Sequence, residues 1–438
     1  MISKNGNVYL MYAGSMRRIL TITLCTLAII GATPLANSAN KIGGSCKSAG
    51  GTTQIGGVKA ICVKTGSKLI WQKATTSKQT TVAATSDTSK CKLKIATNRG
   101  DVAVGGFPRY SIRLRSTGVV TAKVIMIDFS DAVASKTPQQ AFAMISKSSQ
   151  IFDEVSYGKF TYKFDPVYKW YRMSKPAKNY APLTQSFDNH FAYISEAIKL
   201  ADGDVDFKDT ESFIILANPD AKSLGDAGPA FSPNDKNWGI KVDGTVLTNG
   251  ATSAYDLNYW SYIWLNHEIT HTLGMVDLYA FSGDAHRFVG EFGYMGLSSL
   301  ESNSPSLLAW ERWLLNWLDD NQIFCLSTGS TQQKLTPIQS KSGLKAVITP
   351  LGNNKVLVAE SRRAIGIDNK LSKSGVLVYT VDSTIESGFG PIKIYPLNNS
   401  DSKKNSAPLG VNEQITVEGV SIKVLSADSS GDLIQVSK

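Results

Sequence analysis

The segment from His267 to Asp277 reads His-Glu-Ile-Thr-His-Thr-Leu-Gly-Met-Val-Asp, and it holds the residue types that bind a transition metal. Two histidines four positions apart on a helix lie on one face, so both rings can reach a single ion. Glu268 follows the first histidine, where a carboxylate can accept a proton from a water molecule bound to that ion. This spacing is typical of catalytic zinc and predicts a zinc hydrolase.

A third ligand is expected close to this helix, because catalytic zinc usually takes three protein ligands and leaves one position for water. Gly274 can end the helix and turn the chain, since glycine adopts left-handed backbone conformations at little cost. Asp277 follows this turn and is the expected third ligand. Glu291, twenty residues after His271, is the main alternative, although the glycines around it disfavour a helix. The weaker candidates are His286 and Glu301.

The bulk composition is that of an ordinary globular protein. The 438 residues are enough for two to three domains, and 42% are hydrophobic and 19% charged. The formal charge of +10 is spread thinly, without a long run of lysine and arginine. We therefore expect no nucleic-acid partner. From the zinc motif we expect protein or peptide substrates, and we expect a monomer.

The amino terminus has the pattern of a secretory signal peptide. Arg17 and Arg18 precede an apolar run over 19–32, and small residues follow as far as Ala39. We expect residues 1–39 to be removed, with Met16 as the better start. The run is short for a membrane span, although an uncleaved anchor is the alternative. The prediction is a secreted protein, or one loosely associated with the cell wall, with no stable membrane span after cleavage.

Cysteine usage agrees with export. Cys25 lies in the expected signal peptide, which leaves four cysteines, and an even number in an exported chain predicts two disulfides. Three pairings are open. We favour Cys46–Cys62, which closes a short loop, and this leaves Cys91–Cys325 to tie the start of the large domain to its end. A thiolate of Cys91 that blocks zinc in a latent form is a lower-ranked alternative.

The chain after residue 39 divides into four segments by composition. Residues 40–71 predict a small disulfide-stapled β-hairpin module, and residues 72–90, rich in Thr, Ser, Ala and Lys, predict a flexible linker. Residues 91–328 carry the zinc motif and are the expected catalytic domain. Residues 329–438 contain short strands separated by turns, which predict a β-sandwich.

Within the catalytic domain, β-branched and apolar runs predict strands, and apolar residues at helical spacing predict helices. The active-site helix is expected over 256–273, with Asp256 as its N-cap and Trp264 in the core. The other predicted strands are 119–129, 160–164 and 213–217, and the other predicted helices are 138–152, 187–201 and 306–318.

A second metal site is a candidate in the loop Asp202-Gly203-Asp204-Val205-Asp206. Clustered carboxylates in a loop can hold Ca²⁺, and Asp202, Asp204 and Asp206 alternate along this one. The twelve-residue EF-hand pattern is incomplete because its final glutamate is absent. An acidic loop between a helix and a strand is the simpler interpretation.

The stretch from His267 to Tyr279 resembles the active site of the immune inhibitor A-type secreted zinc metallopeptidases, within the metzincin-like group. Gly293-Tyr294-Met295-Gly296 is similar to the methionine turn of that family. Segments at 124–131, 155–158 and 304–311 are similar to family segments as well, so the resemblance spans roughly residues 91–318. Val276 departs from the pattern, because family members often have proline before the aspartate.

This resemblance implies an α/β (α+β) metzincin-like catalytic domain in a secreted zinc endopeptidase. His267, His271 and Asp277 would bind Zn²⁺, with Glu268 as general base and Met295 as a packing platform beneath the metal. Tyr294 and Tyr279 are candidates to support the oxyanion, although packing is the simpler role for each. The alternative from another class is a secreted wall- or glycan-binding protein on an inactive peptidase scaffold. A zinc hydrolase of a non-peptide bond is a third hypothesis.

Overall fold

The structure is a computed structural model that describes residues 41–48, 51–73, 86–96, 105–297, 306–401 and 403–438. The chain divides into two compact units between Ala83 and Ala84. The predicted signal peptide lies outside the described residues. Within the described ranges, no helix is long and apolar enough to cross a membrane.

The small unit is an antiparallel sheet of three strands in the order β1-β2-β3, which extends the predicted hairpin module by one strand. A disulfide joins Cys46 to Cys62 on the central strand, with Cα atoms 5.8 Å apart. The last strand pairs as far as Lys73 with Ala60, so residues 72–73 are strand where a linker was predicted. The strands are β1 (Thr52–Ile55), β2 (Val58–Thr65) and β3 (Lys68–Lys73).

The other end of the predicted linker also has regular structure. Residues Thr88–Cys91 form the 3₁₀ helix η1, and the side chain of Asp87 accepts a hydrogen bond from the Ser89 amide at 3.1 Å. Cys91 is bonded to Cys325, again with Cα atoms 5.8 Å apart. Residues 87–90 therefore belong to the large unit, while residues 74–85 of the predicted linker lie outside the described part.

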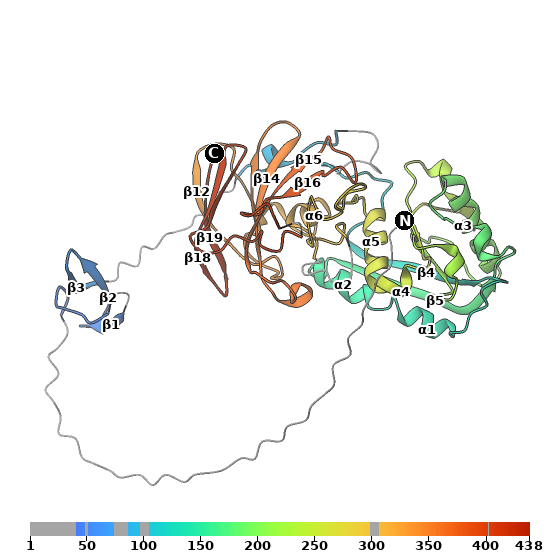
Figure 1. Cartoon of the computed structure of the whole chain (residues 1–438), viewed down its shortest axis with the longest axis horizontal. Coiled ribbons are helices and arrows are strands. Elements are labelled where there is room, and N and C mark those ends of the chain that lie inside the picture. The colour runs from blue at the N-terminus through green and yellow to red at the C-terminus, as the bar shows by residue number, and fades with distance from the viewer. Residues whose placement is uncertain (1–40, 49–50, 74–85, 97–104, 298–305, 402) are drawn as a thin grey trace, which may run out of the picture. The chain divides into compact units, whose positions relative to one another are not determined.

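The large unit contains a five-stranded sheet of order β5-β4-β6-β10-β7 (Figure 1). The first four strands are parallel, and β7 pairs with β10 in the antiparallel sense. Side chains alternate across the sheet, as they must in an extended strand. The strands are β4 (Gly118–Asp128), β5 (Phe160–Arg172), β6 (Ser212–Ala217), β7 (Ala230–Phe231) and β10 (Gly250–Thr252).

Helices cover both faces of this sheet. On β4, Val124 and Met126 enter a core that includes helix α5, while Ile125 and Ile127 enter a second core that includes α3. Figure 1 shows these two helices on opposite sides of the strands. Helix α3 (Phe187–Ala201) matches its predicted range, with Ser186 as N-cap.

The other predicted helices are shorter or broken, and tertiary contacts explain the breaks. The predicted helix over 138–152 is α1 (Pro138–Ala143) followed by α2 (Ser148–Val155), because the turn between them packs on the active-site helix. In that turn the carbonyl of Met144 accepts a hydrogen bond from the hydroxyl of Ser261. Ser148 likewise donates its hydroxyl to the carbonyl of Tyr262 at 3.1 Å.

The predicted helix over 256–273 divides at Ser261, whose φ of 52° interrupts the helical path between α4 (Leu257–Trp260) and α5 (Tyr262–Thr272). The predicted helix over 306–318 shrinks to α6 (Ala309–Leu314). Its early end is explained by Asn316, which has a φ of 60° and turns the chain away.

Residues 323–438 form two packed sheets, so the sandwich begins with β11, before the predicted boundary at residue 329. One sheet has the order β11-β13-β14-β15-β16 and the other the order β12-β19-β18-β17. The first contains β11 (Ile323–Cys325), β13 (Ala346–Pro350), β14 (Lys355–Arg362), β15 (Gly375–Asp382) and β16 (Ile392–Ile394). The second contains β12 (Ser330–Leu335), β17 (Gln414–Val417), β18 (Val420–Asp428) and β19 (Gly431–Ser437).

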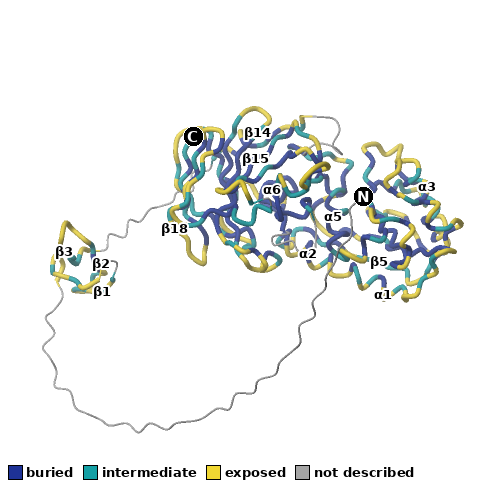
Figure 2. Tube along the Cα trace, in the orientation of Figure 1, coloured by how far each residue is buried: buried dark blue, intermediate teal, exposed yellow. Residues whose placement is uncertain are grey.

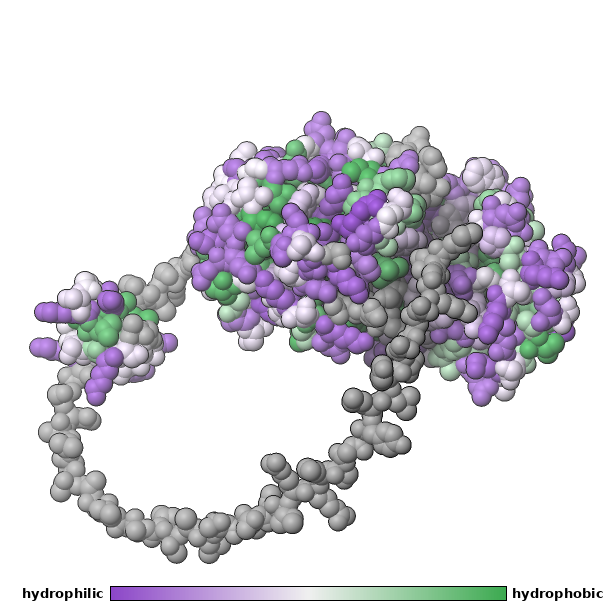
Figure 3. Space-filling view, viewed as in Figure 1, coloured by the Kyte–Doolittle hydropathy of each residue, from purple (hydrophilic) through white to green (hydrophobic). Residues whose placement is uncertain are grey.

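The first of these sheets is buried on both faces, as the dark strands β14 and β15 show in Figure 2. Val376 and Val378 face the second sheet, whereas Leu377 and Tyr379 join the core that contains α5 and α6. The sandwich thus packs directly against the zinc-motif region within one compact unit. The visible outer surface of this unit is largely hydrophilic, with smaller hydrophobic groups (Figure 3).

Candidate metal centre

Helix α5 places His267 and His271 one turn apart on the same side, with ring centroids 4.9 Å apart. The helix is almost entirely buried, and Leu265 and Ile269 on its other side enter the main core. Because that core holds the helix along its length, the two imidazoles project from a rigid support.

The carboxyl end of α5 is a Schellman turn at Gly274. The Gly274 amide donates to the carbonyl of His271 at 2.8 Å, and the Met275 amide donates to that of Thr270 at 3.1 Å. Gly274 has a φ of 98°, which side-chain-bearing residues rarely adopt. Arg109 donates to the carbonyl of Leu273 at 2.8 Å, which places a cation at the negative end of the helix.

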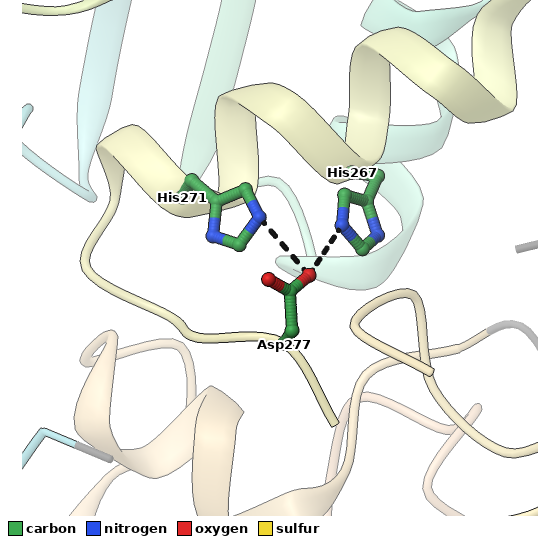
Figure 4. A group of neighbouring side chains, drawn as sticks. All are labelled: His267, His271 and Asp277. Atoms are coloured by element: carbon green, nitrogen blue, oxygen red, sulfur yellow. Dashed lines mark hydrogen bonds and ion pairs between the residues drawn. The ribbon is translucent and has the colours of Figure 1, made fainter. Parts of the chain in front are cut away.

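This turn returns the chain so that Asp277 faces both histidines (Figure 4). Its Oδ1 atom lies 3.0 Å from Nε2 of His267 and 3.3 Å from Nε2 of His271. These three ligand atoms all lie within 4.8 Å of one another. Among the described residues, they form the one group of three or more histidine, cysteine and carboxylate groups gathered so closely.

The other nitrogen of each ring is held by a backbone carbonyl. Nδ1 of His267 lies 2.6 Å from the carbonyl oxygen of Tyr294, and Nδ1 of His271 lies 2.8 Å from that of Met275. A carbonyl can only accept, so each Nδ1 carries a proton and each Nε2 faces Asp277. The Asp277 carboxylate would stabilise positive charge at this point, whether it comes from a metal ion or from protons on the rings.

The ionisation of the triad reflects this arrangement. Burial raises the pKa of the Asp277 carboxyl, but the facing His271 and His267 outweigh burial and hold the pKa well below its usual range. Burial lowers the pKa of His271, but attraction to Asp277 outweighs it and raises the pKa above its usual value. The carboxylate is therefore ionised and favours a cation at this point.

Glu268 points into the same region and is held from the neighbouring sheet. Its Oε2 atom accepts the amide hydrogen of Ala230, the first residue of the edge strand β7, at 2.7 Å. Burial raises the pKa of Glu268 to about 8; His267 opposes that rise, and the charges of Asp277 and Asp256 add to it. Positive charge at the triad would oppose this rise and favour the carboxylate form that a general base needs.

A cavity of about 490 Å³ opens over the triad. One wall is α5, and the opposite wall is the segment leading into β7, which Trp264 fixes by donating its indole N–H to the carbonyl of Gly228 at 2.7 Å. Trp264 was predicted as a core residue, and it both packs in the core and lines the cavity. The charged residues of the lining are Arg113, Asp226, Asp256, Glu268 and Asp277, together with both histidines.

The segment predicted to be a methionine turn forms a turn closed by the Gly296 amide, which donates to the carbonyl of Gly293 at 3.2 Å. Its carbonyls hold both sides of the triad. The carbonyl of Tyr294 accepts a hydrogen bond from His267. The carbonyl of Met295 accepts one at 2.5 Å from the amide of Leu278, the residue that follows Asp277. The side chain of Met295 is fully buried in the main core, where it packs.

The two candidate tyrosines differ in position. Tyr279 lines the cavity, with its ring centroid 6.1 Å from that of His267. The hydroxyl of Tyr294 instead accepts a hydrogen bond from Asn266 at 3.3 Å in the buried core. Tyr294 therefore serves the site through its backbone carbonyl and not through its hydroxyl.

The alternative third ligand lies in a different group. Glu291 is buried, with Oε1 3.5 Å from Nδ1 of His286 and 3.6 Å from Nζ of Lys403. Its amide also donates to the carbonyl of Lys403 at 3.2 Å. Glu291 and His286 thus pair with each other and with Lys403, while Glu301 lies outside the described residues.

The acidic loop that is a candidate calcium site does not gather its carboxylates within the described structure. The Asp204 carboxylate accepts hydrogen bonds from Lys169 at 2.6 Å and from the Tyr171 hydroxyl at 2.8 Å. The Asp206 carboxylate accepts a hydrogen bond from the Lys208 amide at 2.9 Å. Asp202 follows the end of α3. Asp204 and Asp206 thus have separate local partners, which matches the simpler interpretation of this loop.

Some residues at the site could not be identified from the sequence. Asp256 lies at the N-cap position, as predicted, but its side chain makes no capping bond. It instead accepts hydrogen bonds from the amides of Gly228 at 2.8 Å and Ala254 at 3.1 Å, and so shapes the cavity wall. Ser387, from the loop after β15, contacts Asp277. No local pattern marks either role, because the partners are distant in sequence.

Comparisons with known proteins give little beyond this geometry. No family profile matches the chain, and no curated protein matches it. Among solved structures, that of wild-type OgpA from Akkermansia muciniphila is similar over 74% of this chain and 92% of its own, at 14% identity and a TM-score of 0.28. A likeness at this level carries no argument about function. The chain is a mixed α/β protein with several sheets and few helices, in which two histidines and an aspartate converge beside a cavity.

Proposed function

We propose that this protein is a zinc-dependent endopeptidase of the metzincin-like kind, similar to the immune inhibitor A-type enzymes. The observation that carries the proposal is the convergence of Nε2 of His267, Nε2 of His271 and Oδ1 of Asp277 within 4.8 Å. Two imidazole nitrogens and one carboxylate oxygen are a donor set that suits zinc and leaves a fourth position open.

The hydrogen bonds around the rings fit a metal at this point. Each Nδ1 donates to a carbonyl, of Tyr294 or Met275, which orients the ring and directs the Nε2 lone pair inward. Bound there, a zinc ion would supply a Lewis acid that lowers the pKa of water towards about 7 and polarises a carbonyl group.

Glu268 would perform the proton transfers. Its carboxylate, oriented by the Ala230 amide at 2.7 Å, would accept a proton from the water that attacks the peptide carbonyl. It would then deliver that proton to the amine of the leaving product.

The position of β7 favours an extended peptide as the substrate. β7 is the last strand of its sheet in the order β5-β4-β6-β10-β7, and its residue Ala230 lines the cavity. A peptide can add to such an edge through main-chain hydrogen bonds, which do not depend on its side chains. A substrate bound in this way would run past Glu268 and the histidines.

The test is zinc stoichiometry together with digestion of an unbiased peptide library by the full-length protein. The wild type should bind one zinc ion and cleave peptides, and Asp277→Ala should lose both. His286→Ala is the matched control, since it removes a histidine that pairs with Glu291, and it should keep zinc and activity. Wild-type protein that binds no zinc, or binds zinc and cleaves no peptide, would refute the proposal.

A further inference from the structure

We infer that Ser387 is a positioning residue for the metal ligand Asp277, so that the carboxy-terminal sandwich completes the metal centre. This inference rests on the proposed function, because it concerns how the third zinc ligand is held. Ser387 lies in the loop between β15 and β16, and it follows Asp277 by 110 residues.

Three hydrogen bonds join this loop to Asp277. The Asp277 amide donates to Oγ of Ser387 at 3.0 Å, and the Ser387 hydroxyl donates to Oδ2 of Asp277 at 3.4 Å. The Gly388 amide donates to the carbonyl oxygen of Asp277 at 3.1 Å. The backbone on both sides of Asp277 and its side chain are therefore held by two consecutive residues of the sandwich.

The two carboxylate oxygens of Asp277 have different partners. Oδ1 faces Nε2 of His267 and of His271, whereas Oδ2 faces the Ser387 hydroxyl. A hydrogen bond to the outer oxygen fixes the rotation of the carboxylate and keeps Oδ1 directed at the metal position. Such outer contacts orient a ligand before the metal arrives, so that less conformational entropy is lost on binding.

The loop itself is built to hold this position. Its base is closed by the Asp382 amide, which donates to the carbonyl of Pro391 at 2.8 Å, and by the Ser383 amide, which donates to that of Asn354 at 2.9 Å. At its tip Gly388 has a φ of 74°, and a Cβ atom there would lie 2.3 Å from the ring of Phe281. Glycine at this position permits the close approach to the chain that follows Asp277.

A fourth hydrogen bond joins the same two segments, because the Phe281 amide donates to the carbonyl of Gly388 at 3.3 Å. Ser387 is buried, with 8% of its surface exposed, so these bonds form where water competes poorly. Gly388 of the sandwich therefore pairs, through both its amide and its carbonyl, with the segment that follows the helix turn. Metal affinity should therefore depend on a residue outside the predicted catalytic domain.

The experiment compares zinc affinity by chelator competition in the full-length wild type, Ser387→Ala and Ser387→Thr. We expect Ser387→Ala to bind zinc about tenfold more weakly, within the range typical of outer contacts to metal ligands. Ser387→Thr keeps the hydroxyl and should restore affinity. Ser383→Ala is the matched control, a buried serine of the same loop that bonds the carbonyl of Asn354, and it should bind zinc as the wild type does.

Visible absorption of the Co²⁺-substituted proteins gives a second readout, since it reports ligand geometry and not fold stability. The Ser387→Ala spectrum should change, and that of Ser383→Ala should not. If Ser387→Ala does not fold, Ser387→Val replaces it, because valine has nearly the shape of the threonine control but lacks the hydroxyl. Equal zinc affinity and equal spectra in wild type and Ser387→Ala would overturn this inference alone. A wild type that binds zinc without peptidase activity would overturn only the proposed function, and a wild type that binds no zinc would overturn both.

Discussion

Nδ1 of His267 lies 2.6 Å from the carbonyl oxygen of Tyr294, and this bond joins the active-site helix to the turn that contains Met295. The next carbonyl of that turn accepts the amide of Leu278, the neighbour of Asp277, at 2.5 Å. One short turn therefore holds the first histidine and the segment of the aspartate in a common frame. The role of the turn is carried by its backbone, while the methionine side chain fills the core beneath.

Replacing Glu268 by glutamine should separate metal binding from catalysis. Glutamine keeps the size and can still accept from the Ala230 amide, but it cannot take a proton. We expect unchanged zinc content and a fall in kcat of about 10²- to 10⁴-fold, the usual contribution of a general base. Zinc analysis and peptide cleavage on the same sample test this, and near wild-type turnover would remove Glu268 from the mechanism.

The Tyr294 hydroxyl should be dispensable for catalysis. Tyr294→Phe removes the bond from Asn266 but leaves the backbone carbonyl that holds His267. We expect kcat within about twofold of the wild type and a stability loss of about 1 kcal/mol for the broken hydrogen bond. A large fall in kcat at unchanged zinc affinity would instead assign the hydroxyl a role at the oxyanion.

Gly274→Ala should damage the site through the backbone. The φ of 98° at this position is strained for alanine, although a Cβ atom there would meet its nearest neighbour, Cγ of Arg113, at an acceptable 3.4 Å. The cost should be about 1–2 kcal/mol of unfolding free energy. Because the turn carries the chain to Asp277, zinc affinity should fall as well. Urea unfolding and chelator competition measure the two effects, and unchanged values of both would contradict the turn's proposed role.

The disulfide between Cys91 and Cys325 should contribute most of the covalent stabilisation of the large unit. It closes a loop of 234 residues, so its loss should reduce the unfolding free energy by about 5 kcal/mol in the loop-entropy description. Calorimetry of the Cys91→Ser, Cys325→Ser double variant measures this loss. The Cys46→Ser, Cys62→Ser pair is the control, because that bond lies in the separate small unit and should leave the transition of the large unit in place.

Acid should destabilise the protein through His190. Burial lowers the pKa of this histidine to about 4, and its Nε2 lies 2.8 Å from the Thr252 hydroxyl. Between pH 6.5 and 4 the unfolded chain binds a proton that the native state does not, so stability is full above pH 6.5 and falls as the pH drops. At pH 5 the loss from this group should approach about 2 kcal/mol.

His190→Gln removes the titrating group and can keep the bond to Thr252. Its unfolding free energy should therefore show a shallower decline than the wild type between pH 7 and 5, measured by urea denaturation at a series of pH values. If the unfolding free energies of the two proteins fall in parallel with pH, His190 does not cause the loss of stability in acid.

Much of the local structure was predictable because it depends on short-range patterns. Helix α3 has its predicted range, since a serine N-cap and apolar spacing determine it locally. The active-site helix and α6 were predicted too long. The breaks at Ser261 and Asn316 arise from positive φ angles that the surrounding packing imposes and that apolar periodicity does not reveal.

By itself, the sequence determined which atoms of the candidate site come from the stretch between His267 and Asp277. Helical periodicity and a glycine turn operate within eleven residues, so the pattern of residue types sufficed to favour Asp277 over Glu291 as the partner of the histidines. The tertiary structure alone decided what holds these atoms: the carbonyl of Tyr294, the amide of Ala230 and the hydroxyl of Ser387. Backbone groups have no sequence signature, and a serine 110 residues away is brought to Asp277 only by packing of the sandwich against the main core.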